Sequence, residues 1–269
     1  MGLSGRVAVI TGGSSGIGLA LAQQLAREGV AVVLGARRAE KLGAAVRSIR
    51  DAGGRAEAVV MDVTSEADMQ GLVRRAVDVF GGLDLMVCNA GFGFYGTVEE
   101  TPAATMQRII DVNFMGTFYG AAAALPLFRA AGRGHLIMVS SIVGKRGIPL
   151  MSGYSASKAA QAGFAESLRS EFAGTGIAVS VVFPVSTDTE FRHAMERDYR
   201  QGVSGIGPKQ HVDVVAAAIV ACVRKPRAEV FPHATSRALG VLSALAPAFT
   251  DRLVRKFARR REVLVQGPE

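Results

Sequence analysis

The most constraining stretch of this sequence is a glycine-rich turn near its start, between an apolar run and an amphipathic segment. Residues 6–11 (RVAVIT) are mostly apolar, which is typical of a fully buried parallel strand. Residues 12–18 (GGSSGIG) follow directly, and from Ile17 onward the apolar positions recur at helical spacing. A glycine-rich turn between a strand and a helix presents backbone N–H groups and a helix N-terminus to phosphate groups. The stretch therefore predicts a strand–turn–helix unit that binds the pyrophosphate of a dinucleotide.

A second segment, residues 134–158, is typical of a buried strand, a loop and a helix that begins near Ser152. Tyr154 and Lys158 are four residues apart, so on a helix they lie on one face. An ammonium group about 4 Å from a phenol favours the phenolate by up to ~4 kcal/mol at an effective dielectric constant of ~20, or about three pKa units. We therefore expect Lys158 to lower the pKa of Tyr154 into the range that general acid–base catalysis requires. Ser141, at the end of the strand, can donate a hydrogen bond to a substrate carbonyl oxygen.

By itself, Tyr-x-x-x-Lys marks a solvent-exposed helix face more often than a site. Here, however, Ser141 precedes Tyr154 by thirteen residues, and the segment resembles the active-site segment of the short-chain dehydrogenase/reductase family. The glycine turn, Gly-x-x-x-Gly-x-Gly after Thr11, resembles the same family. The resemblance covers about residues 5–232 and comprises five separately placed motifs. It implies one doubly wound α/β domain, a Rossmann fold with a single seven-stranded parallel sheet flanked by helices.

The resemblance also implies a reaction, the reversible transfer of a hydride between a nicotinamide and a carbonyl/alcohol pair. In this reaction Tyr154 protonates the carbonyl oxygen, and Ser141 orients the substrate. Lys158 lowers the pKa of Tyr154 and binds the nicotinamide ribose. Asn113, in the segment DVNFMG, anchors a water in the proton relay that leads to Lys158. An asparagine in mid-helix lowers helix propensity, which favours a role for its amide.

The end of the second expected strand, residues 30–34, indicates which coenzyme is bound. Family members that prefer NAD commonly carry an acid there, whereas this chain has Ala36 followed by Arg37 and Arg38. An acid would repel a 2′-phosphate, whereas Arg37 can pair with it through two hydrogen bonds. We therefore expect NADP(H), against the alternative that the two arginines only begin a solvent-exposed helix. The cofactor-binding residues that the resemblance implies are Gly12, Ser14, Ser15, Gly16, Ile17, Gly18, Arg37, Arg38, Asp62, Val63, Asn89, Ala90, Gly91, Tyr154, Lys158, Pro184, Thr187 and Thr189.

Some of these contacts depend on motifs that the chain matches only in part. Asp62 is expected to contact the adenine amino group, unless it caps the following helix, for which Ser65 is also available. The family sequence Asn-Asn-Ala-Gly begins with Cys88 here, a change that we expect to be harmless. In the motif Pro-Gly-x-x-x-Thr the glycine is replaced by Val185, which does not adopt every backbone conformation open to glycine. The final Thr189 is expected to bind the nicotinamide carboxamide.

Composition restricts the class of protein and its compartment. Cys88 and Cys222 lie in apolar patterns and the four histidines are scattered, so the sequence indicates neither a disulfide framework nor a metal site. No apolar run reaches the ~18 residues that a membrane span needs, and a signal-peptide pattern is lacking, so we expect a cytoplasmic protein. Six basic and two acidic residues give residues 251–262 a charge of +4, half of the formal net charge of +8. This concentration in one tail argues against a nucleic-acid-binding domain.

The sequence predicts an NADP-binding and catalytic domain, residues 1–233, and a helical extension, residues 234–269, which is either part of that domain or peripheral. The extension is apolar over residues 239–249 and then basic, which suits contact with a membrane surface or an acidic carrier protein. The alternative is that its apolar part packs on the core or on a partner subunit. In relatives, the helix expected over 102–131 and the helix of Tyr154 form the main dimer interface, so we expect a homodimer or homotetramer.

The expected substrate is a small molecule with a carbonyl or alcohol group. Apolar residues predominate around it, which favours a lipophilic compound such as a steroid, a retinoid or a long acyl chain, and residues 190–208 suit a mobile lid. A 3-oxoacyl-thioester reductase is an alternative, because a basic surface can dock an acidic carrier. A second alternative is a non-enzymatic NADPH-binding sensor or scaffold, although all four catalytic residues are present. The candidate wall residues are Phe92, Phe94, Tyr95, Ile142, Val143, Leu150, Met151, Val185 and Phe191.

Overall fold

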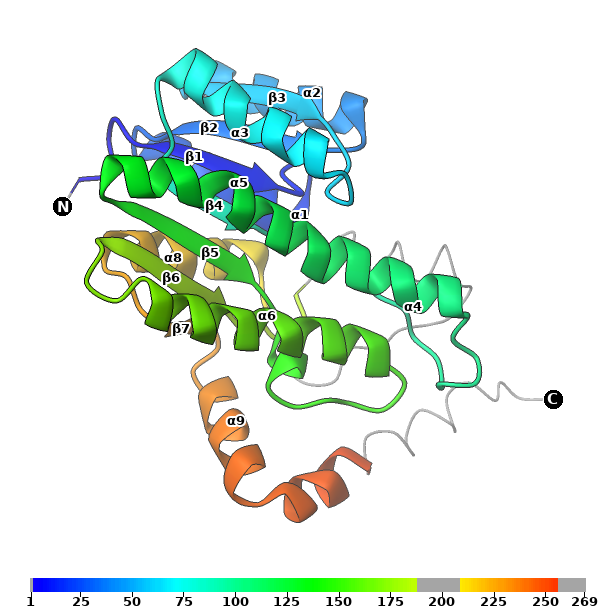
Figure 1. Ribbon diagram of the computed structural model, residues 1–269. Coiled ribbons are helices and arrows are strands. Elements are labelled where there is room, and N and C mark those ends of the chain that lie inside the picture. Colours follow the sequence, from blue (N-terminus) through cyan, green and yellow to red (C-terminus); the bar gives the residue numbers. More distant parts are fainter. Residues whose placement is uncertain (1, 188–208, 256–269) are drawn as a thin grey trace.

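A seven-stranded sheet, parallel throughout, forms the centre of the molecule (Figure 1). The computed structural model describes residues 2–187 and 209–255. The strands follow the order β3-β2-β1-β4-β5-β6-β7, so the chain builds one edge first and then crosses back over β1 to build the other. The expected doubly wound sheet is confirmed. The strands are β1 (Val7–Thr11), β2 (Ala31–Ala36), β3 (Ala56–Val60), β4 (Leu85–Cys88), β5 (Gly134–Val139), β6 (Ile177–Val182) and β7 (Glu229–Val230).

The strand sequences explain why the sheet is buried on both faces. Every residue of β1 (VAVIT) and of β4 (LMVC) is buried. Helices cover both sides of a parallel sheet, so its inner strands are continuously apolar rather than alternating. At the two edges the pattern changes, because β3 has exposed and half-buried positions and β7 has only two residues. Short or partly polar edge strands limit pairing with other chains.

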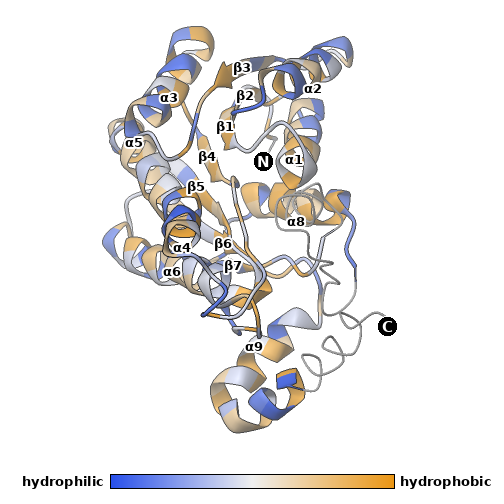
Figure 2. Cartoon of the chain, turned by 90° about the vertical axis from the view of Figure 1, so that its right-hand side faces the viewer, coloured by the Kyte–Doolittle hydropathy of each residue, from blue (hydrophilic) through white to orange (hydrophobic). Residues whose placement is uncertain are grey.

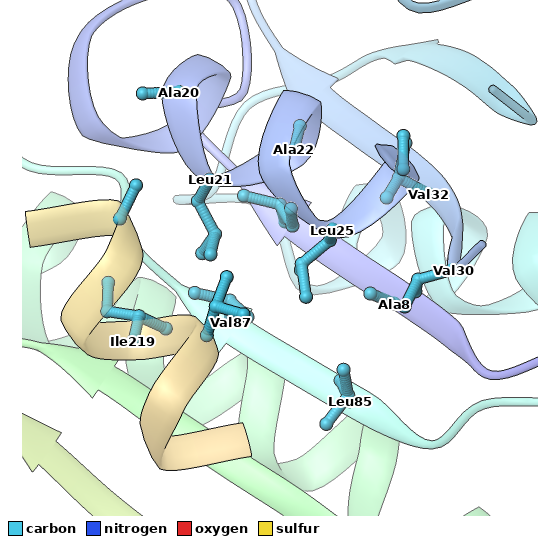
Figure 3. Packing of buried hydrophobic residues seen from close by; sticks show 14 of the residues in the cluster. Ala8, Ala20, Leu21, Ala22, Leu25, Val30, Val32, Leu85, Val87 and Ile219 are labelled. Carbon is cyan, nitrogen blue, oxygen red and sulfur yellow. The ribbon is translucent and has the colours of Figure 1, made fainter. Parts of the chain in front are cut away.

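Helices form a layer on each face of the sheet. Figure 2 shows α1, α2 and α8 on one side and α3, α5 and α6 on the other. In the first layer Leu21 and Leu25 of α1 and Ile219 of α8 pack over Leu85 and Val87 of β4 (Figure 3). The helices are α1 (Gly16–Arg27), α2 (Ala39–Asp51), α3 (Glu66–Phe80), α4 (Ala103–Ile110), α5 (Gly116–Ala131), α6 (Ser152–Glu171), α8 (Val212–Arg224) and α9 (Ser236–Leu245).

The helix expected over 102–131 is continuous but changes its winding in the middle. A π-helical turn, η1 (Asp111–Met115), joins α4 to α5, and Asn113 within it is fully buried. Pro102 is the N-cap of α4 rather than part of its first turn. A π-helical turn accommodates one extra residue and occurs frequently at functional sites. The apolar spacing of the sequence does not reveal it.

Two helical segments follow the sheet. The helix α9 and residues 247–255 lie beyond β7, at one end of the molecule (Figure 1). An ion pair between Arg146 and Asp251 ties the second segment to the loop after β5. The neighbouring Lys145 pairs with Glu229 of β7. Within the described ranges, no helix is both long enough and apolar enough to cross a membrane.

Candidate active site

Ser141, Tyr154 and Lys158 come together because the end of β5 is attached to α6. The Ser140 hydroxyl donates a hydrogen bond to the Lys158 carbonyl oxygen (2.8 Å). Ser141 then caps the short 3-10 turn η2 (Ile142–Gly144), its Oγ accepting a hydrogen bond from the Val143 N–H (3.3 Å). Ser141 is also hydrogen-bonded to Tyr154. The structure therefore brings the three expected groups into one site.

Lys158 is buried, with only 2% of its surface exposed. Its Nζ donates hydrogen bonds to the Val139 carbonyl oxygen (2.9 Å) and to Gln161 Oε1 (3.2 Å). Burial lowers the pKa of Lys158 from 10.5 to about 7, and the neighbouring Cys88 opposes this shift. A neutral amine has two hydrogens, which these two acceptors occupy, whereas an ammonium group has a third. Lys158 can therefore take up and release a proton near neutral pH.

Tyr154 does not have the lowered pKa that the sequence predicts. Burial raises its pKa well above 10, and the hydrogen bond with Ser141 only partly opposes this shift. The Lys158 Nζ lies 5.7 Å from the centre of the Tyr154 ring. The sequence-based expectation assumed a fully charged ammonium group, but burial also destabilises the charge on Lys158. Tyr154 is consequently a neutral phenol at neutral pH, suited to donate a proton.

Asn113 holds the loop after β4 against α6. Its Oδ1 accepts a hydrogen bond from the Phe92 N–H (2.7 Å), and its Nδ2 donates to the Phe92 carbonyl oxygen (2.8 Å). The same Nδ2 donates to Ser157 Oγ (2.8 Å). The side-chain amide is thus occupied by protein partners. Its main-chain carbonyl oxygen accepts hydrogen bonds from Thr117 Oγ1 (2.7 Å) and Gln161 Nε2 (2.9 Å).

Gln161 and Ser157 belong to this network, and the sequence analysis missed both. Gln161 is fully buried, and it accepts a hydrogen bond from Lys158 while donating to the Asn113 carbonyl oxygen and to Thr117 Oγ1. Ser157 Oγ donates to the Tyr154 carbonyl oxygen (2.8 Å) and accepts from Asn113. A signal was present, because Gln161 follows Lys158 by three residues and therefore shares its helix face. Polar residues on a buried helix face require partners.

The glycine turn forms a compact cradle at the end of β1. Thr11 Oγ1 accepts hydrogen bonds from the N–H groups of Asn89 and Ala90, both at 3.0 Å. A Cβ added to Gly12 would lie 3.0 Å from the Ala90 Cα, and the φ angle of Gly12 is +67°. Ser15, the N-cap of α1, makes no capping hydrogen bond, and the first turn of α1 contains no acidic residue. The first N–H groups of this helix thus face no competing acid, and the cradle fits the pyrophosphate of a dinucleotide.

The two arginines after β2 have different surroundings. Arg38 Nη2 donates hydrogen bonds to Ser15 Oγ (3.1 Å) and Ser14 Oγ (3.5 Å), so its guanidinium lies at the glycine turn. Arg37 Nη1 lies 4.0 Å from Asp62 Oδ2, and both side chains are exposed. An exposed ion pair of this length contributes little stability, so it leaves Arg37 able to bind an anion. Arg38 thus lies at the glycine turn, whereas Arg37 is exposed beside Asp62.

Asp62 does not cap α3. The N-cap is Ser65, whose Oγ accepts a hydrogen bond from the Asp68 N–H (3.2 Å). Asp62 Oδ1 instead accepts hydrogen bonds from the N–H (3.0 Å) and the hydroxyl (2.9 Å) of Thr64. The capping alternative considered for Asp62 is therefore excluded.

Gly91 lies between the cradle and Lys158. A Cβ added to Gly91 would be 3.6 Å from both Asn113 Oδ1 and Lys158 Nζ. The segment Asn89 to Gly91 thus leads from the glycine turn to Lys158. Val63, in contrast, is buried beside α5, where a Cβ on Gly116 would approach Val63 Cβ to 3.0 Å.

The end of β6 approaches the catalytic loop. The Pro184 carbonyl oxygen accepts a hydrogen bond from the first N–H of η2 (2.9 Å). Val185, which replaces the family glycine, has a negative φ angle, since Leu150 is the one non-glycine residue with positive φ in the described ranges. Thr187 Oγ1 donates to the Val185 carbonyl oxygen (2.9 Å). Thr189 lies outside the described residues.

Two loops meet on the expected substrate side. Tyr95 is buried against Leu150, and the Gly96 N–H donates a hydrogen bond to the Leu150 carbonyl oxygen (2.8 Å). Leu150 has φ of 66°, a left-handed conformation that costs a leucine roughly 1–2 kcal/mol. Such strain frequently marks a functional loop. The expected lid, residues 190–208, and Phe191 within it lie outside the described residues.

Both cysteines are buried and free. Burial raises the pKa of Cys88 to about 12, so its thiol stays protonated near Lys158. In residues 2–187 and 209–255, no three His, Cys, Asp or Glu side chains are grouped so that they could hold a metal ion.

Comparisons with known proteins agree with this geometry. A profile of the family described as "short chain dehydrogenase" matches residues 6–200. Ketoacyl reductase HetN of a Nostoc species is 29% identical over 262 residues, which cover 95% of this chain and 90% of HetN. Glycine betaine reductase ATRR of Emericella nidulans is 38% identical over 188 residues, and the match spans 70% of this chain but only 15% of that longer protein.

Two solved structures have the same fold. A short-chain dehydrogenase/reductase from Burkholderia phymatum in complex with NAD has a TM-score of 0.84 and 26% identity, covering 93% of this chain and 96% of its own. A variant of the actinorhodin polyketide ketoreductase with NADPH has a TM-score of 0.75 and 31% identity, covering 82% and 90%. With a family profile matched over most of its length, this chain belongs to the short-chain dehydrogenase/reductase family of oxidoreductases.

Proposed function

We propose that this protein is an NADPH-dependent oxidoreductase that interconverts a ketone or aldehyde and the corresponding alcohol. The observation that carries the proposal is the catalytic group: a neutral Tyr154 hydrogen-bonded to Ser141, beside a buried Lys158 that titrates near neutral pH. In this proposal the glycine turn, with the uncapped first turn of α1, holds the pyrophosphate. When bound, the coenzyme supplies the hydride. The backbone of Gly91 passes close to Lys158, so the segment from the turn to the lysine would lie along the coenzyme.

The catalytic residues act on the substrate oxygen. Ser141 Oγ and the Tyr154 hydroxyl donate hydrogen bonds to the carbonyl oxygen, which polarises the C=O bond. As the carbonyl carbon accepts the hydride, the O–H bond of Tyr154 breaks and its proton moves to the substrate oxygen, giving the alcohol. Negative charge that develops on this oxygen meets donors already in position, which is an effective source of rate enhancement. Oxidation of the alcohol follows the same steps in reverse.

Lys158 returns the proton to Tyr154. The phenolate left after reduction favours the charged form of Lys158, and the third hydrogen of that ammonium group then faces a negative partner. Gln161 keeps the amine in position, because its amide is itself held by the Asn113 carbonyl oxygen and by Thr117. Asn113 supports the relay because its side chain, bonded to Phe92 and Ser157, fixes the backbone whose carbonyl oxygen holds Gln161. The burial of Lys158 makes deprotonation at neutral pH easy.

The preference for NADPH rests on the end of β2. Ala36 stands where an acid would repel a 2′-phosphate, and Arg37 and Arg38 follow it. The Arg38 guanidinium already lies at Ser14 and Ser15 of the turn, and Arg37 is exposed. A planar guanidinium matches phosphate oxygens through two hydrogen bonds. Asp62, free of a capping role, is proposed to contact the adenine.

A lipophilic substrate fits the apolar loops on the substrate side, where Tyr95 and Leu150 pack together. A 3-oxoacyl thioester is a second candidate, which the similarity to ketoacyl reductase HetN and to the actinorhodin polyketide ketoreductase favours. For the dimer, Phe118 of α5 exposes 42% of its surface next to Phe164 of α6, and an exposed aromatic side chain there would suit an interface on these helices.

The experiment is NADPH oxidation with a panel of ketones, aldehydes and 3-oxoacyl thioesters, using wild type and Tyr154→Phe. We expect the variant to lose turnover by about a hundredfold or more while it binds NADPH as wild type does. Tyr119→Phe, which changes a tyrosine on α5, is the matched control and should keep full activity. Retained activity in Tyr154→Phe would exclude Tyr154 as the proton donor. Equal affinity of wild type for NADH and NADPH would contradict the coenzyme assignment.

A further inference from the structure

The C-terminal segment, residues 236–255, has its apolar and polar sides reversed. The side chains that α9 and the next helix bury against the protein are Ser236, Ser243 and Thr250, which recur every seven residues. The side chains on the outside are large and apolar: Leu245 is 80% exposed and Phe249 58% exposed. A surface helix that functions in water alone normally buries its apolar stripe. The exposed set comprises Val241, Leu242, Leu245, Phe249 and Leu253.

The inward hydroxyl groups make this arrangement stable. Ser236 Oγ donates to the His233 carbonyl oxygen (2.6 Å), and Thr250 Oγ1 donates to the Pro247 carbonyl oxygen (2.9 Å). The buried hydroxyl groups of Ser236 and Thr250 therefore both have hydrogen-bond partners. Small side chains on the inner side let the helices approach the protein, and the position is secured by the ion pair of Asp251 with Arg146. The segment is thus tied to the loop after β5 while its large apolar side chains stay exposed.

The charges of this segment are also divided between its two sides. Its acid, Asp251, is paired with Arg146 of the protein body, whose side chain is only 17% exposed. Its basic residues, Arg237, Arg252 and Arg255, are exposed. The sequence that follows, residues 256–261 (KFARRR), adds four more basic residues. An apolar surface bordered by arginines results, whereas the acid, which is itself half exposed, is paired with the protein body.

We propose that residues 236–255 dock the protein on the surface of an anionic lipid bilayer. Leu245 and Phe249 enter the boundary between headgroups and acyl chains, while Arg252 and Arg255 bind lipid phosphates. A second copy of this chain suits the surface less well, because a two-fold contact would bring two strongly basic segments together. An acidic protein would satisfy the charges, but would not require two large exposed apolar side chains beside them. Figure 2 shows that this segment forms one end of the molecule, so a flat surface can reach it.

The docking surface is joined to the catalytic loop. Arg146, the partner of Asp251, and Lys145, beside Gly240 of α9, both belong to the loop that begins with Ser141. When the C-terminal segment is docked, the loop that begins with Ser141, which would receive the substrate, therefore lies close to the lipid surface. The docking proposal rests on exposure and charge alone, so it stands independently of the proposed reaction.

The test is co-sedimentation of the full chain with vesicles of phosphatidylcholine, with and without phosphatidylserine, at low and high salt. We expect binding to the anionic vesicles that weakens at high salt. Leu245→Glu with Phe249→Glu should reduce the bound fraction about tenfold or more. The matched control, Val79→Glu with Val214→Glu, makes the same charge change at two exposed valines on α3 and α8 and should bind as wild type does. Arg252→Gln and Arg255→Gln should each reduce binding about fivefold.

The proposal is overturned if wild type stays in the supernatant with anionic vesicles at low salt, or if the control variant loses binding equally. It is also overturned if the Leu245/Phe249 variant keeps vesicle binding but changes a dimer to a monomer in sedimentation velocity, because the surface would then bind a second copy. It is overturned as well if the Arg252 and Arg255 variants lose binding but the Leu245/Phe249 variant does not, because apolar insertion would then play no part. Circular dichroism shows that each variant is folded before its binding is compared.

Discussion

Lys158 is an amine enclosed by protein, and its surroundings govern how stability varies with pH. Its pKa is about 7 in the folded chain and 10.5 when unperturbed. Between pH 7 and pH 10.5, Lys158 is protonated in the unfolded chain and has lost its proton in the folded chain. The free energy of unfolding therefore rises with pH in this window, by up to about 1.4 kcal/mol per pH unit. Below pH 7 both states are protonated, and the cost of burying the charge is fully present.

Replacing Lys158 with methionine should remove this dependence. We expect the difference in free energy of unfolding between wild type and Lys158→Met to move in favour of wild type as the pH rises from 7 to 9. Urea denaturation of the coenzyme-free proteins at several pH values measures it. Parallel pH curves for the two proteins would show that Lys158 is not titrating in this range.

The positions of the site residues could be predicted from the sequence, but some of their properties could not. Tyr154, Lys158 and Ser141 were predictable because spacing on one strand and one helix determines their arrangement. The pKa of Tyr154 was not predictable, since it depends on how deeply the folded chain buries the side chain. Gln161 shares a helix face with Lys158, but its partners, the Asn113 carbonyl oxygen and Thr117, belong to another helix. Such a network depends on how elements pack.

At the scale of elements, the glycines of α1 and α3 should respond to the same substitution in opposite ways. A Cβ added to Gly18 in α1 would lie 2.4 Å from the Gly12 carbonyl oxygen and 2.6 Å from Asn89 Nδ2. Gly18→Ala should therefore lower the free energy of unfolding by about 1–3 kcal/mol and weaken coenzyme binding. Gly71, inside α3, has open space around it. Gly71→Ala should stabilise the protein by roughly 0.5–1 kcal/mol.

Urea denaturation of both variants measures these effects, and coenzyme titration tests the turn. A stability loss of equal size at Gly71 would mean that helix propensity is not the deciding factor there. The matched pair separates crowding at the glycine turn from the general effect of adding a methyl group.

The elements themselves followed from apolar patterning to within one or two residues, as for β1, expected over 6–11 and found over Val7–Thr11. The π-helical turn at Asn113 could not be predicted in this way, because the number of residues per helical turn depends on which backbone groups find hydrogen-bond partners. Gln161 and Thr117 both donate to the Asn113 carbonyl oxygen, so the turn is stabilised from outside its own helix as well as within it. A pattern of apolar residues carries no information about such bonds.

At the scale of the whole molecule, Asp251 attaches the C-terminal segment to the body. Asp251→Asn removes the charge that Arg146 faces, so residues 247–255 should detach more often by local unfolding. We expect trypsin to cleave at Arg252 and Arg255 about fivefold faster or more, since an unpaired charge costs about 1–3 kcal/mol. The melting temperature of the sheet should change by only a few degrees, because little of the core is involved.

Glu28→Gln is the control for this prediction, because Glu28, at the end of α1, forms an exposed ion pair with Arg224 of α8. It should leave cleavage at Arg252 and Arg255 unchanged. Cleavage that is equally slow in wild type and Asp251→Asn would show that other contacts hold the segment.

The order of the strands has a consequence for synthesis on the ribosome. Strands β1, β2 and β3 emerge in sequence and are neighbours in the sheet, so one half can assemble at once. The second edge of β1 pairs with β4, which is translated only after α3. During that interval the nascent chain exposes an apolar strand edge that can pair with other chains. Lys158 meets Gln161 later still, once α6 has emerged. Chaperone protection of this edge is therefore needed until β4 has been translated, before any of the proposed catalytic residues has been added.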